Sequence, residues 1–185
     1  MELAPGGSVI DYLHKHGAVG EDLARMWCKR MCQALRYCHK KGIAHRDLKC
    51  DNLLLDHDLQ IKIGDFGFCR RCINLYSGMR IYSNTFCGSS SYVAPEVIEG
   101  KPYDPIAADL WSAGVCIYVI LNNLMPFDDS NIVSMHNDQV TRHWSIANGQ
   151  LSEPAKRLLL RMLEPDAAMR PTMDQVLNTS WMRMR

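Results

Sequence analysis

The 185-residue sequence has no long hydrophobic run and almost no net charge. Its longest uninterrupted apolar stretch is residues 113–121, whereas a membrane-spanning helix needs roughly 18 such residues. We therefore expect no membrane span, and no signal peptide is evident at the N-terminus. A formal net charge of +1 provides no overall field that would attract nucleic acid or an anionic membrane, so neither is expected as a partner.

The sequence also lacks the paired spacing of a zinc site, although it holds eight cysteines. Cys69 and Cys72 form a C-x-x-C pair, but no second C-x-x-C and no H-x-x-x-H accompanies it. Several other cysteines lie in apolar helical patterns, where cysteine acts as a small core residue. Free thiols in a reducing, cytoplasmic compartment are the expectation, and a zinc site at this pair is the less favoured alternative.

Length and composition suit one globular domain with a substantial core, because 47% of the residues are hydrophobic and 22% are charged. Apolar residues recur every three or four positions over residues 21–39, which predicts an amphipathic helix. Residues 107–121 are apolar nearly all round and predict a core helix. Short strands are expected at 53–55 and 59–63, and further helices at 8–16, 132–143, 172–178 and between Ser152 and Pro165.

Three short motifs stand out from this background. Residues 45–52 read H-R-D-L-K-C-D-N, residues 65–67 read D-F-G and residues 94–96 read A-P-E. In this order they resemble the catalytic loop, the metal-binding loop and the end of the activation segment of protein kinases, whose signature they match. Five fixed letters in eight, with a second motif close by, rarely coincide by chance.

The resemblance implies a mainly α fold, namely a kinase-like C-terminal lobe in which a helical bundle carries a small β hairpin. Within residues 1–185 it implies a hinge-like start at 1–7, a catalytic loop at 43–52, an activation segment at 65–96 and a helical subdomain at 97–185. The sequence contains neither a G-x-G-x-x-G loop nor a V-A-I-K lysine. We therefore expect the N-terminal lobe to be absent from this chain, which would expose an apolar patch around Phe66, Leu54 and His45.

The resemblance also assigns roles to four polar residues. Asp47 would accept or orient the proton of a substrate hydroxyl, and Lys49 would reach the transferred phosphate. Asn52 and Asp65 would supply oxygen ligands to Mg²⁺, which prefers them. Each of these residues alone is ordinarily a solvated surface group, so it is their joint spacing that favours a site.

Adenine binding is implied near the N-terminus. The backbone groups of Glu2 and Ala4 occupy hinge positions that usually hydrogen-bond the adenine of ATP, and Leu54 would lie beneath the ring. Lys49, Asn52 and Asp65 complete the expected nucleotide contacts. A frayed N-terminal tail is the alternative for residues 1–7.

Other positions resemble regulatory and structural residues of the family. Arg46 would pair with a phosphate placed on Thr85 by an upstream kinase, ordering the loop; an unmodified loop threonine is the less favoured alternative. Glu96 and Arg170 resemble a buried ion pair. Asp109 resembles the residue that hydrogen-bonds the catalytic-loop backbone from the core helix.

Within the superfamily, the sequence is similar to serine/threonine kinases and most similar to the testis-specific serine/threonine kinases of the calmodulin-dependent-kinase-like group. Residues 85–89, 102–105 and 125–130 carry this closer likeness. The implied function is ATP-dependent phosphoryl transfer to protein Ser or Thr, with Asp51 suggesting basic substrates. Autonomous activity is doubtful without the upper lobe, and a non-catalytic kinase-like binding module is the alternative.

Overall fold

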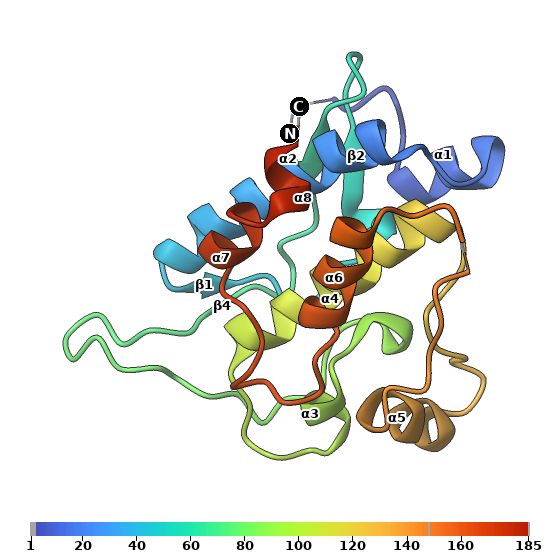
Figure 1. Ribbon diagram of the computed structural model, residues 1–185. Coiled ribbons are helices and arrows are strands. Elements are labelled where there is room, and N and C mark those ends of the chain that lie inside the picture. The colour runs from blue at the N-terminus through green and yellow to red at the C-terminus, as the bar shows by residue number, and fades with distance from the viewer. Residues whose placement is uncertain (1–2, 148, 185) are drawn as a thin grey trace.

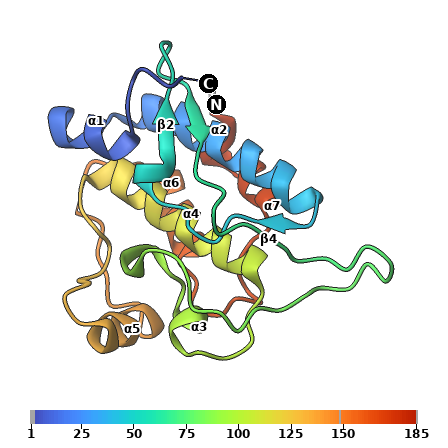
Figure 2. The ribbon, with the colours of Figure 1, turned by 180° about the vertical axis from the view of Figure 1, so that it is seen from behind.

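The computed structural model describes residues 3–147 and 149–184 (Figure 1). Its body is a bundle of helices, and two small antiparallel sheets lie along one side (Figures 1 and 2). In chain order the helices are α1 (Val9–His16), α2 (Glu21–Lys40), α3 (Pro95–Ile98), α4 (Pro105–Asn122), α5 (Ile132–Val140), α6 (Glu153–Met162), α7 (Met173–Leu177) and α8 (Ser180–Arg183). The mainly α prediction agrees with this arrangement.

Helix α4 forms the centre of the bundle and packs against α2 and α6. Its N-terminus is set by Asp104, whose side chain accepts a hydrogen bond from the N–H of Ile106, and by Pro105 in the first turn. The helix is long and apolar enough to cross a membrane, but 83% of that window is buried inside the fold. This burial is what an apolar core helix requires.

Helix α2 is amphipathic, as its sequence predicts, and buries one stripe against α4 and α7. The buried stripe is Ala24, Trp27, Cys28, Met31, Cys32 and Leu35. The indole N–H of Trp27 donates to the carbonyl of Leu59 at 2.8 Å, which ties the helix to the turn before β3 (Ile61–Ile63). The helix thus forms the wall behind the catalytic loop.

The strands place the predicted motifs next to one another. β2 (Leu53–Leu55) pairs antiparallel with β3, with Leu53 opposite Ile63. β1 (Ile43–Ala44) pairs antiparallel with β4 (Arg70–Arg71), with Ala44 opposite Arg70. Residues 45–52 connect β1 to β2, and residues 64–69 connect β3 to β4, so the H-R-D and D-F-G motifs lie side by side.

Several boundaries differ from the sequence-based expectations. α5 ends at Val140 and not at residue 143, because Arg142 adopts a positive φ of 56° that a helix cannot continue through. α4 begins at Pro105, two residues early, and β3 is two residues shorter than expected. The pairing of β1 with β4 and the short helices α3 and α8 were not expected. Their segments are too short for a periodic signal.

The exposed patch expected around Phe66, Leu54 and His45 is partly wrong. His45 is fully buried, and its ring packs edge-on against Phe66 at a centroid distance of 4.9 Å. Its Nε2 also lies 2.9 Å from the carbonyl oxygen of Gly64. Phe66 is 42% exposed and Leu54 is partly exposed, so the apolar surface is smaller than the motif positions suggest.

Candidate active site

The carboxylate of Asp47 lies at the centre of the catalytic loop and is nearly buried, at 6% exposure. The amide nitrogen of Asn52 donates to the Asp47 carbonyl at 2.8 Å and lies 3.4 Å from its Oδ2. The Asp47 N–H lies 3.3 Å from Nδ1 of the buried His45. These contacts fix the direction of the carboxylate, which the 45–52 spacing alone does not define.

A residue that the sequence analysis missed completes this network. The backbone N–H of Ser89 donates to Asp47 Oδ1 at 2.9 Å, and the Ser89 hydroxyl lies 3.1 Å from the same oxygen. Lys49 Nζ donates to the Ser89 hydroxyl at 2.8 Å and lies 3.4 Å from Asp47 Oδ2. The activation segment therefore contacts the catalytic loop directly. A Gly-Ser pair shortly before A-P-E was the only available sequence signal.

Gly88 allows this contact. Its φ is +99°, and a Cβ at this position would lie 2.8 Å from the Arg46 carbonyl oxygen. Both the backbone conformation and the close approach require glycine. The neighbouring Ser89 can reach Asp47 only because residue 88 has no side chain.

The two predicted metal ligands are brought together by the end of the β2–β3 hairpin. The N–H of Gly64 donates to the Asn52 carbonyl at 2.8 Å, which places Asp65 beside Asn52. Asp65 has a φ of +51°, is exposed, and accepts a hydrogen bond from the Gly67 N–H at 3.1 Å. Because the Asn52 amide nitrogen is held by Asp47, the Asn52 amide oxygen is available as a ligand. This oxygen donor set fits Mg²⁺.

The hinge-like segment lies against β2. The Gly6 N–H donates to the Leu55 carbonyl at 2.9 Å, and the Leu55 N–H donates to Gly7 at 2.8 Å. Ser8 forms an antiparallel bridge with the partly exposed Leu54, and the Gly7 N–H donates to the Ala4 carbonyl at 3.3 Å. The adenine-binding roles of Ala4 and Leu54 stay a prediction. The expectation for Glu2 lies outside the described residues.

Asp109 joins α4 to the catalytic loop. Its Oδ2 accepts a hydrogen bond from the His45 N–H at 2.8 Å and lies 2.9 Å from His39 Nε2, and its Oδ1 accepts from the Arg46 N–H at 2.9 Å. Arg46 has a φ of +68°, a strained conformation for a non-glycine residue. The buried carboxylate, 1% exposed, holds that conformation in place.

The predicted regulatory pair does not touch in this structure. The Arg46 guanidinium donates to the Phe68 carbonyl at 2.8 Å and to the Ser83 hydroxyl at 3.2 Å. Arg70 lies 3.4 Å from the same hydroxyl. Thr85 is exposed, and its N–H lies 3.3 Å from the Ser83 oxygen. Arg46 and Arg70 therefore both lie near Ser83, which precedes Thr85 by two positions.

Glu96 and Arg170 form a bidentate ion pair, with N–O distances of 2.6 and 2.7 Å. Only 1% of the Arg170 side chain is exposed, and it lies over the ring of Trp111. The guanidinium also donates to the carbonyls of Glu164, Ala107 and Pro165. Every arm of the buried cation thus has an acceptor, and α3 is joined to the loop before α7.

The cysteines are all unpaired in the part of the chain that the structure describes. Burial raises the pKa of Cys32 to about 12, and burial likewise raises the pKa of Cys28 and Cys116. These thiols are therefore neutral core groups. Among the described residues no three His, Cys, Asp or Glu side chains gather as a metal site, and Cys69 is exposed while Cys72 is buried.

Several known proteins have sequences similar to that of this chain. Mouse testis-specific serine/threonine-protein kinase 1 is 44% identical over 184 residues, which is 99% of this chain and 50% of that protein. Human testis-specific serine/threonine-protein kinase 3 is 42% identical over 182 residues, covering 98% of this chain and 66% of that protein. Rice CBL-interacting protein kinase 3 is 41% identical, over 99% of this chain and 40% of its own length.

The chain thus spans about half the length of the first of these relatives. A family profile described as the protein kinase domain matches residues 1–182. The motif geometry, the identity to serine/threonine kinases and this match agree, and the chain belongs to the protein kinase domain family.

Proposed function

We propose that this chain supplies the catalytic half of an ATP-dependent serine/threonine protein kinase site. The observation that carries the proposal is the Asp47 carboxylate, which is held between Asn52, Lys49 and Ser89. Phosphoryl transfer demands mainly that the nucleophile be aimed and the phosphate charge be balanced. A rigid carboxylate beside an ammonium group meets both demands.

In this proposal each residue has one task. Asp47 accepts a hydrogen bond from the substrate Ser or Thr hydroxyl and takes up its proton. Lys49, 24% exposed and 3.4 Å from Asp47, contacts the transferred phosphate as a compact cation. Ser89 holds Asp47 through its N–H and Lys49 through its hydroxyl, so it sets the distance between base and cation.

Asn52 and Asp65 are the residues that would hold Mg²⁺. When bound, the ion would neutralise charge on the phosphates of ATP. Two oxygen ligands plus substrate phosphates is the usual way in which proteins bind this ion. Leu54 would lie beneath the adenine ring, and the backbone groups of Glu2 and Ala4 would hydrogen-bond its edge, as the resemblance implies.

Two nucleotide-binding motifs of protein kinases do not occur in this sequence. These 185 residues contain no G-x-G-x-x-G loop and no V-A-I-K lysine. We infer that they correspond to the C-terminal lobe and that the cover over the phosphates is supplied by residues outside this sequence. Positioning accounts for roughly 7–11 kcal/mol of a barrier, so this chain alone should turn over essentially no substrate.

Substrate and regulation are further parts of the proposal. Asp51 is exposed next to Asn52, which supports a preference for substrates with basic residues. A phosphate added to Thr85 by an upstream kinase would find Arg46 and Arg70 nearby, since both already contact Ser83. Charge-assisted hydrogen bonds of this kind contribute roughly 1.5–3 kcal/mol each.

Metal binding can be tested without measuring activity. Mn²⁺ added with ATP should broaden the NMR amide signals of Asn52, Gly64 and Asp65 through paramagnetic relaxation, and Asp65→Asn should abolish the effect. Asp166→Asn is the matched control. The exposed Asp166 side chain accepts a hydrogen bond from the Ala168 N–H and lies in the loop between α6 and α7. Broadening that persists in Asp65→Asn would reject the assigned ligands.

Catalysis can be tested by joining this chain to the nucleotide-covering half of a complete kinase. The chimaera should phosphorylate Ser or Thr peptides, and Asp47→Asn should lower kcat by about 10²–10⁴-fold. A folded chimaera that binds ATP but transfers no phosphate would instead favour the alternative of a non-catalytic binding module.

A further inference from the structure

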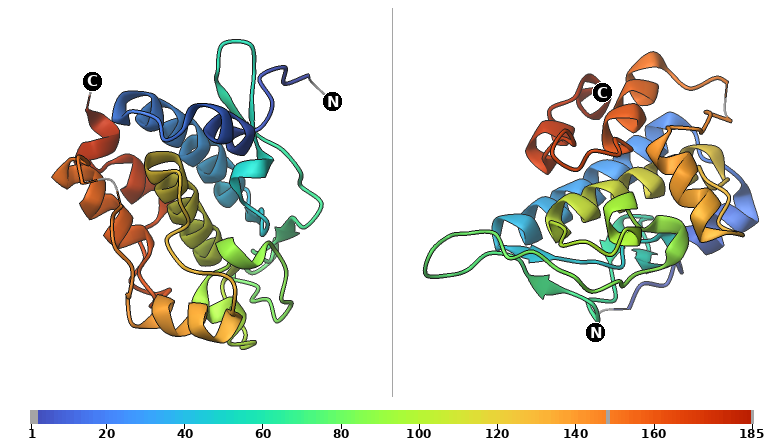
Figure 3. Two further views of the ribbon diagram at one scale, coloured as in Figure 1. Left: turned by 90° about the vertical axis from the view of Figure 1, so that its right-hand side faces the viewer. Right: turned by 90° about the horizontal axis from the view of Figure 1, so that it is seen from below.

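A hairpin in the activation segment projects from the body of the molecule (Figures 1 and 3). Its base is the antiparallel bridge between Ile73 and Arg80. Within it, the Asn74 N–H donates to the Met79 carbonyl at 2.9 Å, and the Gly78 N–H donates to the Asn74 carbonyl at 2.8 Å. The Asn74 side chain accepts hydrogen bonds from two further turn amides. The hairpin therefore has a defined shape without contacts to the bundle at its tip.

The tip of this hairpin is apolar and exposed. Leu75, Tyr76 and Met79 are 73%, 100% and 69% exposed. No charged residue occurs in residues 74–79. Three large apolar side chains exposed on one short turn are typical of an interaction surface and not of scattered surface residues. Because the turn is already ordered, burying it against a partner costs little conformational entropy.

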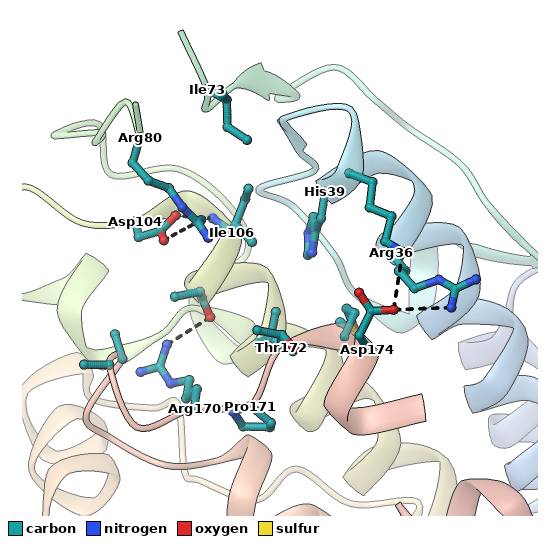
Figure 4. Close-up of a pocket in the computed structure, with 16 residues that line it drawn as sticks. Arg36, His39, Ile73, Arg80, Asp104, Ile106, Arg170, Pro171, Thr172 and Asp174 are labelled. Atoms are coloured by element: carbon teal, nitrogen blue, oxygen red, sulfur yellow. Dashed lines mark hydrogen bonds and ion pairs between the residues drawn. The ribbon is translucent and has the colours of Figure 1, made fainter. Parts of the chain in front are cut away.

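A cavity of about 380 Å³ opens beside the base of the same hairpin (Figure 4). Its apolar lining comes from three parts of the chain and includes Ile73, Ile106, Leu110, Pro171 and Met173. It lies apart from the catalytic site, because none of Asp47, Lys49, Asn52 and Asp65 contributes to it.

The charges around the opening are paired within the chain. Arg80 lies 2.6 Å from Asp104, and Arg36 lies 3.4 Å from Asp174 (Figure 4). Lys40 lies 3.5 Å from the same Asp174 oxygen. Since these cations already have carboxylate partners, the cavity offers little to a strongly acidic ligand. An uncharged apolar group can bind in the cavity and leave all of these ion pairs intact.

The tip and the cavity match in chemistry but cannot meet within one molecule. Ile73 and Arg80 belong both to the base of the hairpin and to the wall of the cavity. The strands of the hairpin hold the tip roughly 10 Å from the base, because the chain rises about 3.3 Å per residue in a strand. Two copies with their hairpins antiparallel would place each tip at the base of the other. A single two-fold axis then satisfies both contacts at once.

We propose that this hairpin is a self-association element and that its tip, Leu75, Tyr76 and Met79, enters the cavity of a second copy of this chain. The contact is reciprocal, so each copy donates one tip and accepts one tip. The proposal is independent of phosphoryl transfer, since neither surface includes a residue assigned to the reaction.

The test is sedimentation velocity of the full chain over a concentration series from micromolar to submillimolar. The unmodified chain should show a monomer–dimer equilibrium. Leu75→Ser combined with Tyr76→Ser should raise the dimer dissociation constant by at least about 100-fold, because two apolar side chains lose their burial. Leu124→Ser is the matched control, because Leu124 is 58% exposed and follows the opposite end of α4. It should leave the equilibrium unchanged.

A second variant tests the cavity directly. Ala168 is exposed and lines the opening, so Ala168→Trp should fill the cavity and also prevent dimerisation. Mixing the tip variant with Ala168→Trp should restore a weaker heterodimer, because one intact tip still meets one intact cavity. A monomer at every concentration, or a dimer that survives the tip variant, would overturn the proposal. An apolar peptide or lipid that fills the cavity of a monomeric chain would overturn it as well.

Discussion

The backbone N–H of Arg46 donates to the carboxylate of Asp109 at 2.9 Å, which joins the catalytic loop to the core helix across 63 positions of sequence. The same carboxylate accepts the His45 N–H. Arg46 has a positive φ, and a residue held in such a conformation costs roughly 1–3 kcal/mol. The conformation of the catalytic loop therefore depends on a residue of the core helix, and several measurable consequences follow from this and related contacts.

Asp109→Ala should lower the free energy of unfolding by about 2–6 kcal/mol, because two buried amides lose their acceptor at about 1–3 kcal/mol each. Urea denaturation measures the loss, and amide exchange at His45 and Arg46 should accelerate. Asp22→Ala is the control. Its side chain is 97% exposed and pairs with Arg25, so the change should stay below about 1 kcal/mol. Equal losses in the two variants would contradict this account.

Arg170→Ala should destabilise the fold by about 3–5 kcal/mol, because it leaves the Glu96 carboxylate without its partner. The matched variant is Arg142→Ala. Arg142 pairs with Glu164 at the same distance of 2.6 Å, but its side chain is 58% exposed, so the loss should be at most about 1 kcal/mol. Chemical denaturation of both variants gives the comparison. A soluble Arg170→Ala protein with an unchanged melting temperature would show that the pair is not structural.

Gly88→Ala and Gly78→Ala separate steric contact from backbone strain. Both glycines have positive φ, but an added Cβ meets the Arg46 carbonyl at 2.8 Å at position 88 and nothing within 4 Å at position 78. Gly78→Ala should cost about 1–2 kcal/mol from strain alone. Gly88→Ala should cost more and should also shift the Ser89 amide signal, since Ser89 would move away from Asp47. Identical stabilities would mean that the close approach at Gly88 is relaxed in solution.

The stability of the fold should decrease as the solution is acidified, partly because of Glu21. Burial alone would raise the pKa of Glu21, but hydrogen bonds from Ser152 and from the Trp181 indole together lower it below its ordinary value. A lowered pKa in the folded state contributes stability above the unfolded value of about 4.3, and that contribution disappears as the pH falls through the folded value.

Glu21→Gln should therefore be less stable than the unmodified chain at neutral pH, and the difference should shrink as the solution is acidified. Melting temperatures measured from about pH 7 to about pH 3 give the comparison. Asp22→Asn provides the neighbouring control, because the Asp22 side chain is 97% exposed and lies 2.8 Å from Arg25. A constant difference between Glu21→Gln and the unmodified chain across this range would rule out the linkage.

Much of the bundle is readable from local patterns. The three-to-four residue spacing of apolar side chains predicts α2, and the nearly continuous apolar run predicts the buried α4. The helices expected to start near Ser152 and Thr172 are also present. Each begins after an N-cap, which depends only on a side chain and the amides two or three residues later. The motif spacing likewise singled out Asp47, Asn52 and Asp65, which the structure places on adjoining loops.

Contacts between distant segments were not readable from local patterns. The Glu96–Arg170 pair and the contact of Asp109 with the catalytic-loop backbone were expected only from the resemblance to the family. Nothing near Ser89 in the chain indicates that its N–H meets Asp47 across 42 positions, and nothing in residues 73–80 indicates a projecting hairpin beside a cavity. His45 was expected in an exposed apolar patch, but the structure buries it. Helix periodicity and capping arise between near neighbours, so a linear sequence carries them. The position of Ser89, the burial of His45 and the cavity beside Ile73 arise only when separate elements pack, because each depends on atoms that many intervening residues bring together.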